Sequence, residues 1–275
     1  MDSTNQIQDS QAWYNHGNVL SEIGHYEGAI AKYDKVLQAQ PKDYRAWSCR
    51  GYALESLGRY EEAVTSFDRA ISFHPKFALA WQGRGIALGK LNRYEEALAN
   101  FKMALKLKPD DYKAWYNHGK ALVLLCRYEE AIASFDKALE FKPDKHQAWY
   151  NRGIAFAYLG RYQEAIASFD TALIIKPSCD YAWNYRGIVL GKLGRYQEAL
   201  TSFDKSLKIK SRNPNAWYGR ACCYALQGNA ELAVENLQRT MELQPYLCRV
   251  MASTDPNFNL IRNNSKFQAL MAEID

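Results

Sequence analysis

Cysteine and histidine are the residue types of this chain best suited to metal binding or nucleophilic chemistry, and their spacing supports neither. Six cysteines and five histidines are spread over 275 residues, with no CxxC pair and no histidine at a metal-ligand spacing from a cysteine. The sequence therefore indicates neither a zinc site nor a disulfide framework. It also shows no Gly-rich phosphate loop, no nucleophile elbow and no group of His and carboxylate residues outside the repeated pattern described below. We expect no enzymatic activity, no metal and no cofactor.

A recurring arginine is the second candidate for chemistry, because a row of arginines could bind phosphate groups. It stands at the same place in successive intervals of the chain, at Arg59, Arg93, Arg127, Arg161 and Arg195. Each is followed within three positions by Glu or Gln, so neutralising local charges at helix ends explains it better. The net charge of +5 is also mild for this length. RNA binding through this arginine-lined edge stays an alternative.

A fixed period sets the elements that must position these residues. All seven tryptophans are 34 residues apart, at Trp13, Trp47, Trp81, Trp115, Trp149, Trp183 and Trp217. Gly follows four residues after six of them, Ala sixteen residues after all seven, and Phe or Tyr twenty residues after six. Such a period, without insertion or deletion, predicts a repeat array.

Each repeat is predicted to form two helices. Around Trp47, the first helix is expected from about Tyr44 to Leu57, where Gly58 can take the left-handed conformation that stops a helix. The second is expected from about Tyr60 to Phe73, before Pro75 prevents its continuation. Neither helix can bury its apolar face alone, so neighbouring repeats must stack.

The W-x3-G, Y-x-x-A, F-x-x-A and P positions together resemble the tetratricopeptide repeat, over about residues 11 to 245, and the repeats are similar to arrays of cyanobacterial proteins. The resemblance implies an all-α fold, a right-handed superhelix of seven 34-residue helix pairs with a C-terminal capping helix. We expect a polar N-terminal segment at 1–10 and a capping segment at 246–275. The repeats are expected at 11–44, 45–78, 79–112, 113–146, 147–180, 181–214 and 215–245.

Several residues depart from the repeat pattern. Asn92 and Cys126 replace the turn glycine, and Cys126 is expected to be mildly strained there. Ser211 replaces the closing proline, which predicts a looser junction. After the last repeat, a capping helix is expected from apolar residues at helical spacing: Phe267, Leu270, Met271 and Ile274.

A pattern of charges is predicted to link each repeat to the next. Arginine stands three residues after a tryptophan wherever the preceding repeat has Asp twenty-one residues after its own tryptophan. The pairs are Asp34–Arg50, Asp68–Arg84, Asp136–Arg152, Asp170–Arg186 and Asp204–Arg220. Where the preceding repeat offers Lys102, the position holds His118. We expect inter-repeat ion pairs that belong to the scaffold, the alternative being coincidence between copies of one template.

Partner binding is expected on the concave face formed by the first helices, whose columns vary between repeats while the packing columns do not. The predicted binding residues are Arg45, Tyr52, Lys90, Lys113, Tyr116, Lys120, Tyr150, Ile154, Tyr158, Tyr181, Ile188, Lys192 and Tyr218. Tyrosine offers a large contact area at a low cost in rotamer entropy, and a hydroxyl for backbone groups. A segment with acidic and apolar residues would suit this surface. The alternative is that these tyrosines are ordinary solvated residues of the helix surface.

One known ligand of the family can be compared with the sequence directly. In the resembling family, the C-terminal carboxylates of heat-shock chaperones are held by a clamp of Lys and Asn on successive first helices. Asn18 matches one of these positions, but Tyr14 stands where the lysine should be and Cys49 where the second asparagine should be. We therefore do not expect this chain to bind chaperone tails.

The predicted function is a protein–protein interaction scaffold or adaptor that binds a peptide or protein segment. The sequence shows neither the features of a signal peptide nor an apolar run of about 18 residues, so we expect a cytoplasmic protein with no membrane partner. It is expected to be a monomer or to self-associate weakly. A self-assembling repeat module and a regulatory region of a larger multidomain effector are the alternatives.

Overall fold

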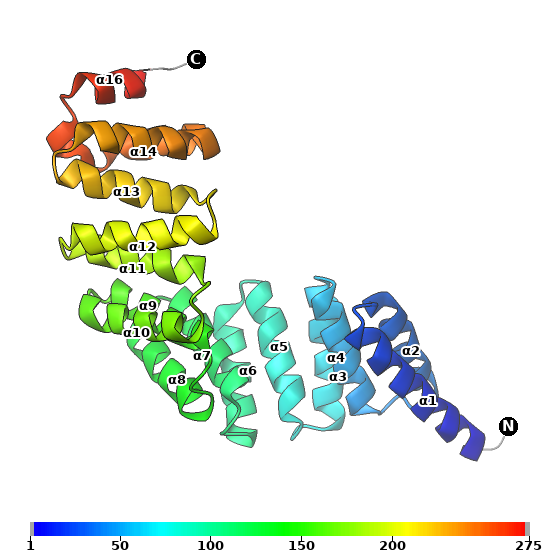
Figure 1. Cartoon of the computed structure of the whole chain (residues 1–275). Coiled ribbons are helices and arrows are strands. Elements are labelled where there is room, and N and C mark those ends of the chain that lie inside the picture. Colours follow the sequence, from blue (N-terminus) through cyan, green and yellow to red (C-terminus); the bar gives the residue numbers. More distant parts are fainter. Residues whose placement is uncertain (1–2, 273–275) are drawn as a thin grey trace. The chain divides into compact units, whose positions relative to one another are not determined.

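The computed structural model describes residues 3–272, in which every regular element is a helix (Figure 1). The chain divides into two compact units between Pro143 and Asp144. The first unit contains α1 (Ser3–Glu22), α2 (Tyr26–Ala39), α3 (Tyr44–Ser56), α4 (Tyr60–Phe73), α5 (Ala78–Lys90), α6 (Tyr94–Leu107), α7 (Tyr112–Leu124) and α8 (Tyr128–Phe141). The second contains α9 (His146–Tyr158), α10 (Tyr162–Ile175), α11 (Asp180–Lys192), α12 (Tyr196–Ile209), α13 (Pro214–Leu226), α14 (Ala230–Leu243), α15 (Pro245–Thr254), the 3-10 helix η1 (Pro256–Ile261) and α16 (Ser265–Ala272).

Consecutive helices pack as pairs within each unit, as the colour sequence in Figure 1 shows. The first helices α3, α5 and α7 each have 13 residues and the second helices α4, α6 and α8 each have 14, so the pairs are close copies. Within each unit, a second helix also packs against the first helix of the next pair, as α4 does on α5 and α10 does on α11. The predicted all-α array of tetratricopeptide-like helix pairs is thus confirmed.

The turn between the two helices of a pair requires a left-handed residue. Glycine fills this position in most repeats, with φ of +77° at Gly58 and +74° at Gly194. Asn92 and Cys126 replace it and hold the same conformation, with φ of 61° and 58°. Side chains with a Cβ are disfavoured there, and Asn tolerates the conformation better than other residues do.

The core of each pair is built on a close approach between the first-helix glycine and the aromatic ring of the second helix. A Cβ placed on Gly85 would lie 2.7 Å from Cε1 of Phe101, so only glycine leaves room for this ring. Phe67 and Phe135 are completely buried at the equivalent position. Pairing of the two helices therefore depends on two positions of the repeat. The first is a glycine without a side chain, and the second is an aromatic residue whose ring fills the space beside that glycine.

The tryptophan lies at the junction between repeats. Its ring is partly exposed, and its indole N–H donates a hydrogen bond to the carbonyl of the residue six positions earlier, at 2.8 Å from Trp47 to Pro41. Trp217 makes the same bond to Ser211, at 3.0 Å, although serine replaces proline there. The backbone carbonyl, and not the proline ring, is what the tryptophan requires.

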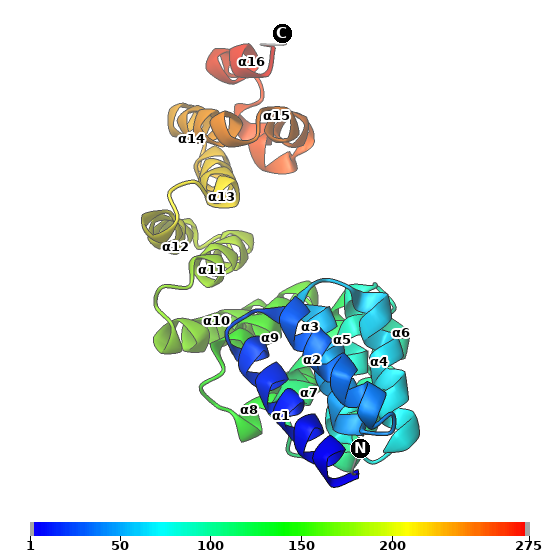
Figure 2. The same ribbon diagram turned by 90° about the vertical axis from the view of Figure 1, so that its right-hand side faces the viewer.

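Three short helices follow the last repeat, where one capping helix was predicted. Pro245 begins α15 and does not interrupt helical structure, because proline is well tolerated in the first turn of a helix. Helix η1 packs on α13, while α15 and α16 pack on α14 (Figure 2). Phe258 and Phe267 stack with 5.6 Å between ring centroids and join the core of the last repeat. Phe267 and Leu270 are buried as predicted, and Ile274 lies outside the described residues.

The N-terminal helix begins at Ser3 and therefore runs through most of the segment expected to be a polar extension. Helix α1 has 20 residues, compared with 13 in the first helices that follow it. None of the helices in residues 3–272 combines the length and the apolar character needed to cross a bilayer.

Candidate functional site

Ion pairs of the predicted pattern join successive repeats in both units. Four of them have N–O distances between 2.6 and 2.9 Å: Asp34–Arg50, Asp68–Arg84, Asp170–Arg186 and Asp204–Arg220. Arg186 also donates a hydrogen bond from Nη1 to Ser202 Oγ at 2.7 Å, so one guanidinium joins three helices. The fifth predicted pair, Asp136–Arg152, combines residues of different units and stays a prediction. These four arginines join neighbouring repeats of the scaffold.

His118, which stands where five of the other repeats have this arginine, makes a different contact. His118 is buried, and its Nδ1 lies 2.9 Å from Ser134 Oγ on the second helix of the same repeat. Burial, together with the positive charge of Lys102, lowers the pKa of His118 to about 4. A neutral imidazole therefore replaces the ion pair at this junction.

The recurring turn arginines are engaged by carboxylates of their own repeats. Five pairs at i and i+3 have N–O distances of 2.6 to 2.7 Å: Arg59–Glu62, Arg93–Glu96, Arg127–Glu130, Arg161–Glu164 and Arg195–Glu198. The hydrogen bond to arginine lowers the pKa of each glutamate. This geometry supports the local explanation of these arginines over a surface that awaits phosphate groups.

Six of the predicted binding residues lie in the first unit. Arg45, Lys90, Lys113 and Lys120 are exposed, whereas Tyr52 and Tyr116 are half-buried. A pocket of about 610 Å³ brings together Tyr52 of α3 and Lys113 of α7, with Gln82 and Ile86 of α5 between them. The Tyr52 hydroxyl donates a hydrogen bond to the Leu79 carbonyl at 2.7 Å. Lys120 lies 5.6 Å from the ring centroid of Tyr116, and neither residue lines this pocket.

The positions compared with the chaperone clamp are occupied by contacts within the chain. The Tyr14 hydroxyl lies 3.3 Å from Cys49 Sγ, and Tyr33 donates a hydrogen bond to Asn18 Oδ1 at 2.9 Å. Burial raises the pKa of the Cys49 thiol, so it carries no charge at neutral pH. Tyr14 and Cys49 supply no positive charge themselves, although the Arg45 guanidinium lies 5.8 Å from the Tyr14 ring centroid. That this chain does not bind chaperone tails stays a prediction.

The other seven predicted residues lie in the second unit. Tyr158 and Lys192 are exposed, Ile154 is buried, and Tyr150, Tyr181, Ile188 and Tyr218 are half-buried. Tyr150 forms edge-to-face contacts with Tyr181 and Tyr185, at centroid distances of 4.6 and 5.7 Å. Tyr150 therefore contributes more to packing between α9 and α11 than the sequence suggested.

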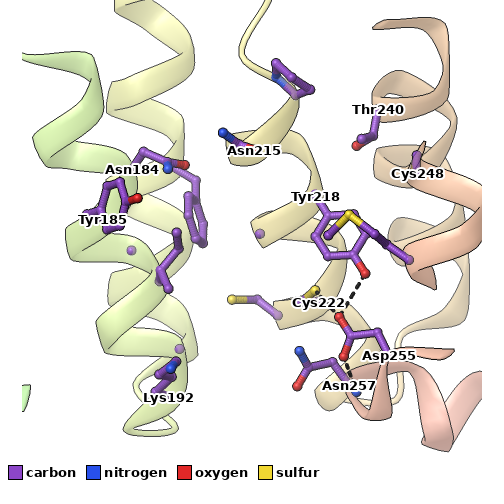
Figure 3. Close-up of a pocket in the computed structure, with 18 of the residues that line it drawn as sticks. Asn184, Tyr185, Lys192, Asn215, Tyr218, Cys222, Thr240, Cys248, Asp255 and Asn257 are labelled. Atoms are coloured by element: carbon purple, nitrogen blue, oxygen red, sulfur yellow. Dashed lines mark hydrogen bonds between the residues drawn. The ribbon is translucent and has the colours of Figure 1, made fainter. Parts of the chain in front are cut away.

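A pocket of about 420 Å³ brings together Ile188, Lys192 and Tyr218 (Figure 3). Helices α11 and α13 supply these residues, and the C-terminal segment adds Asp255 and Asn257. The Tyr218 hydroxyl donates a hydrogen bond to Asp255 Oδ2 at 2.8 Å, while the backbone N–H of Asn257 donates to Asp255 Oδ1 at 2.9 Å. Burial and the carboxylate both raise the pKa of Tyr218, which stays protonated. The last helices thus form one wall of this pocket.

The residues that directly follow the tryptophan are nearly buried in three repeats. Ser48, Gln82 and Asn184 are at most 5% exposed. In two of them a buried amide atom has no hydrogen-bond partner among the described residues: Nε2 of Gln82 and Oδ1 of Asn184. Each of these two residues lines one of the two pockets. Buried polar atoms without a partner are rare in folded proteins, so both are candidate contacts for a ligand.

Comparison with known proteins agrees with the helix-pair geometry. The family model described as tetratricopeptide repeat matches residues 14–76, 83–146, 127–179, 150–214 and 184–246. The chain belongs to the tetratricopeptide-repeat family. No curated protein sequence matches this tetratricopeptide-repeat chain significantly.

Solved tetratricopeptide-repeat structures are similar to this chain. YrrB, whose structure is described as having an unusual peptide-binding site, is 26% identical with a TM-score of 0.58, over 69% of this chain and 98% of that one. A tetratricopeptide repeat protein from Parabacteroides merdae is 19% identical with a TM-score of 0.66, over 93% of this chain and 100% of the other. The Cut9–Hcn1 tetramer chain is 17% identical with a TM-score of 0.66, over 93% of this chain and 47% of that one. The latter two support the fold alone.

Sequence reasoning missed two features of this tetratricopeptide-repeat chain that define its second-unit pocket. Asn184 directly follows Trp183, and tyrosine holds the equivalent position in four of the seven repeats, so the sequence pattern indicates an aromatic surface there and not a buried amide. Asp255 stands in the C-terminal segment, outside the 34-residue period, and no spacing rule connects it with Tyr218. A search of each column for polar residues among aromatic ones would have found Asn184.

Proposed function

We propose that this chain is a protein-interaction scaffold whose first helices bind a peptide or protein segment. The supporting observation is that each unit has a pocket lined by first helices, with a buried amide atom that lacks a partner and an exposed lysine at the same pocket. A peptide backbone offers both a donor and an acceptor, and so matches amide side chains. Peptide binding by the similar YrrB structure adds to this proposal.

The ligand suited to these pockets has apolar and acidic residues. Lys192 lines the pocket of the second unit, with Ile188 as an apolar neighbour. The pocket of the first unit has Ile86, and its lining includes Lys108 and Lys113 together with Asp110 and Asp111, of which Asp111 caps α7. An acidic side chain could meet Lys113 or Lys192, and an apolar side chain could enter beside the isoleucine. In the second-unit pocket, the hydroxyl of Tyr218 is held by the Asp255 carboxylate, which keeps it protonated.

A display selection tests the proposal. Random linear peptides are selected against the full chain, and the affinities of the enriched peptides are measured by fluorescence anisotropy against scrambled versions. We expect sequence-dependent binding that weakens when Lys113 or Lys192 is changed to Glu. Failure to enrich any peptide that binds more tightly than its scrambled version would refute peptide binding.

Self-association is the second candidate function. The C-terminal end of the second unit exposes several large apolar side chains, with Tyr246 at 84%, Leu260 at 70% and Val250 at 48%. Exposed apolar groups at the end of an array could pair two copies. Light scattering at increasing protein concentration would show a rising mass, which Tyr246→Ser with Leu260→Ser should abolish if these residues pair.

A cytoplasmic location stays part of the proposal. All six cysteines have free thiols in the structure. Free thiols are characteristic of proteins kept in a reducing compartment. Fractionation of native cells with antibodies against the chain would test the location.

A further inference from the structure

The pocket between α11 and α13 has features that specify its ligand more closely than the proposed function does. Its volume of about 420 Å³ suits one large side chain together with a short stretch of backbone. Apolar groups dominate its lining, with Ile188 of α11, Phe203 of α12, and Cys222 and Leu226 of α13. An apolar side chain would be desolvated on entering.

Asn184 provides a polar group that this lining leaves without a partner. The side chain is 4% exposed, and its Oδ1 is buried with no hydrogen bond to any residue between 3 and 272. Figure 3 shows its amide directed from α11 toward α13. A buried acceptor without a partner is unfavourable, so a ligand that donates a hydrogen bond to it gains affinity. Since an amide also carries two donors, a peptide group is the ligand chemistry that complements it fully.

Lys192 provides a charge at the other end of the same helix. It lies eight residues after Asn184, which places it about 12 Å further along α11. The side chain is exposed, and no carboxylate of the described chain pairs with it, although its Nζ lies 5.8 Å from the ring centroid of Tyr162. Lys137 of α8, by contrast, is paired with Glu140. Lys192 is therefore available to an anionic group of the ligand.

The carboxylate already in the pocket is engaged. Asp255 accepts hydrogen bonds from the Tyr218 hydroxyl and from the backbone N–H of Asn257. Both carboxylate oxygens of Asp255 accept hydrogen bonds from groups of the chain, and these bonds partly compensate its negative charge. The positive charge of Lys192 therefore determines that the ligand carries an anionic group. A cationic ligand would be repelled by Lys192, and the engaged Asp255 would not offset this repulsion.

We propose that this pocket anchors an extended peptide in which an apolar residue and an acidic residue are three or four positions apart. The apolar side chain fills the space beside Ile188 and Phe203, its backbone pairs with the Asn184 amide, and the acidic side chain meets Lys192. An extended chain advances about 3.3 Å per residue, so about 12 Å corresponds to three or four residues. The inference rests on the proposed function and adds the recognition rule for its second-unit site.

The test uses peptides selected from a random display library with the full chain as bait, followed by affinity measurements on Asn184→Leu and Lys192→Glu. We expect enrichment of an apolar residue with Asp or Glu at the stated spacing. Asn184→Leu, which keeps the site covered but removes the amide, should weaken binding about fivefold to tenfold. Lys192→Glu should select peptides with Lys or Arg at the former acidic position. Lys208→Glu, an exposed lysine of α12 outside the pocket, is the matched control and should change nothing.

The outcomes separate this inference from the proposed function. Peptides that bind the chain equally well after both pocket substitutions, but lose affinity with Lys113→Glu in the first unit, would overturn the inference and leave peptide binding intact. Enriched peptides without the apolar–acidic spacing would overturn it too. Absence of any sequence-dependent peptide would instead refute the proposed function. Circular dichroism of each variant shows whether the helices are retained, and Asn184→Gln provides a second variant if Asn184→Leu loses structure.

Discussion

Two glycines of α5, four residues apart, should respond in opposite ways to alanine. A Cβ on Gly85 would lie 2.7 Å from Phe101 Cε1, whereas a Cβ on Gly89 would meet nothing within 4 Å. Alanine in place of glycine stabilises a helix interior by about 1 kcal/mol, and by less near the helix end where Gly89 lies. Forcing an extra methyl group into a filled core costs about 1–3 kcal/mol. Gly85→Ala should therefore lower the free energy of unfolding by about 0–2 kcal/mol, and Gly89→Ala should raise it by up to about 1 kcal/mol.

Comparison of the unfolding free energies of Gly85→Ala and Gly89→Ala isolates the cost of crowding against the Phe101 ring. The gain in helix propensity is largely shared, so the difference of about 1–3 kcal/mol between them measures the crowding at Phe101. Urea unfolding of the full chain, followed by far-UV circular dichroism, gives both values if the slopes stay equal to the wild-type slope. Equal stabilities of the two variants, or a more stable Gly85→Ala, would refute the claim that close approach requires glycine at this column.

Three further predictions concern charge and thiols. A double-mutant cycle of Asp170→Ala and Arg186→Ala in urea unfolding should give a coupling energy of about 0.5–1 kcal/mol that shrinks with added salt; strict additivity would exclude the ion pair. The pKa of His118, held at about 4 against 6.5 in an unfolded chain, predicts stability that is complete above pH 6.5 and lost as pH falls toward 4, by up to about 3 kcal/mol; His118→Gln should remove this dependence, and an unchanged pH profile would contradict it. Exposed Cys126 should react with a thiol reagent well before Cys223, which is buried and has a pKa raised to about 12; mass spectrometry of partly modified protein would show the order, and simultaneous labelling would disprove it.

The regular part of the fold could be predicted because one period carries all its constraints. The expected second helix from about Tyr60 to Phe73 has these bounds in the structure, and the first helix of that repeat differs only at its last residue. The pairing of Asp170 with Arg186 also followed from the alternation of charges between repeats. In both cases the interacting residues recur at fixed separations in the sequence. The separation alone therefore predicts which residues are in contact.

The site could be predicted only in part because burial and tertiary contacts do not follow the period. Asn184 and Tyr218 share a column, yet one is buried with an unpaired atom and the other is bonded to Asp255. That difference depends on the C-terminal segment, which lies outside the repeats. Pro245 shows a related difficulty, since proline both ends one helix and fits the first turn of the next.

A hydrogen bond from the indole N–H to the backbone carbonyl six residues earlier fixes the length of the stretch between them at Trp47, Trp81, Trp115, Trp183 and Trp217. Trp47 reaches Pro41, Trp81 reaches Pro75 and Trp115 reaches Pro109, each at 2.8 Å. One residue added to or removed from that short stretch would move the carbonyl out of range and detach the ring from the neighbouring repeat. A gene for such a chain can thus lengthen or shorten without damage most readily by copying or losing whole blocks of 34 codons. The uninterrupted spacing of the tryptophans is the expected trace of growth by duplication.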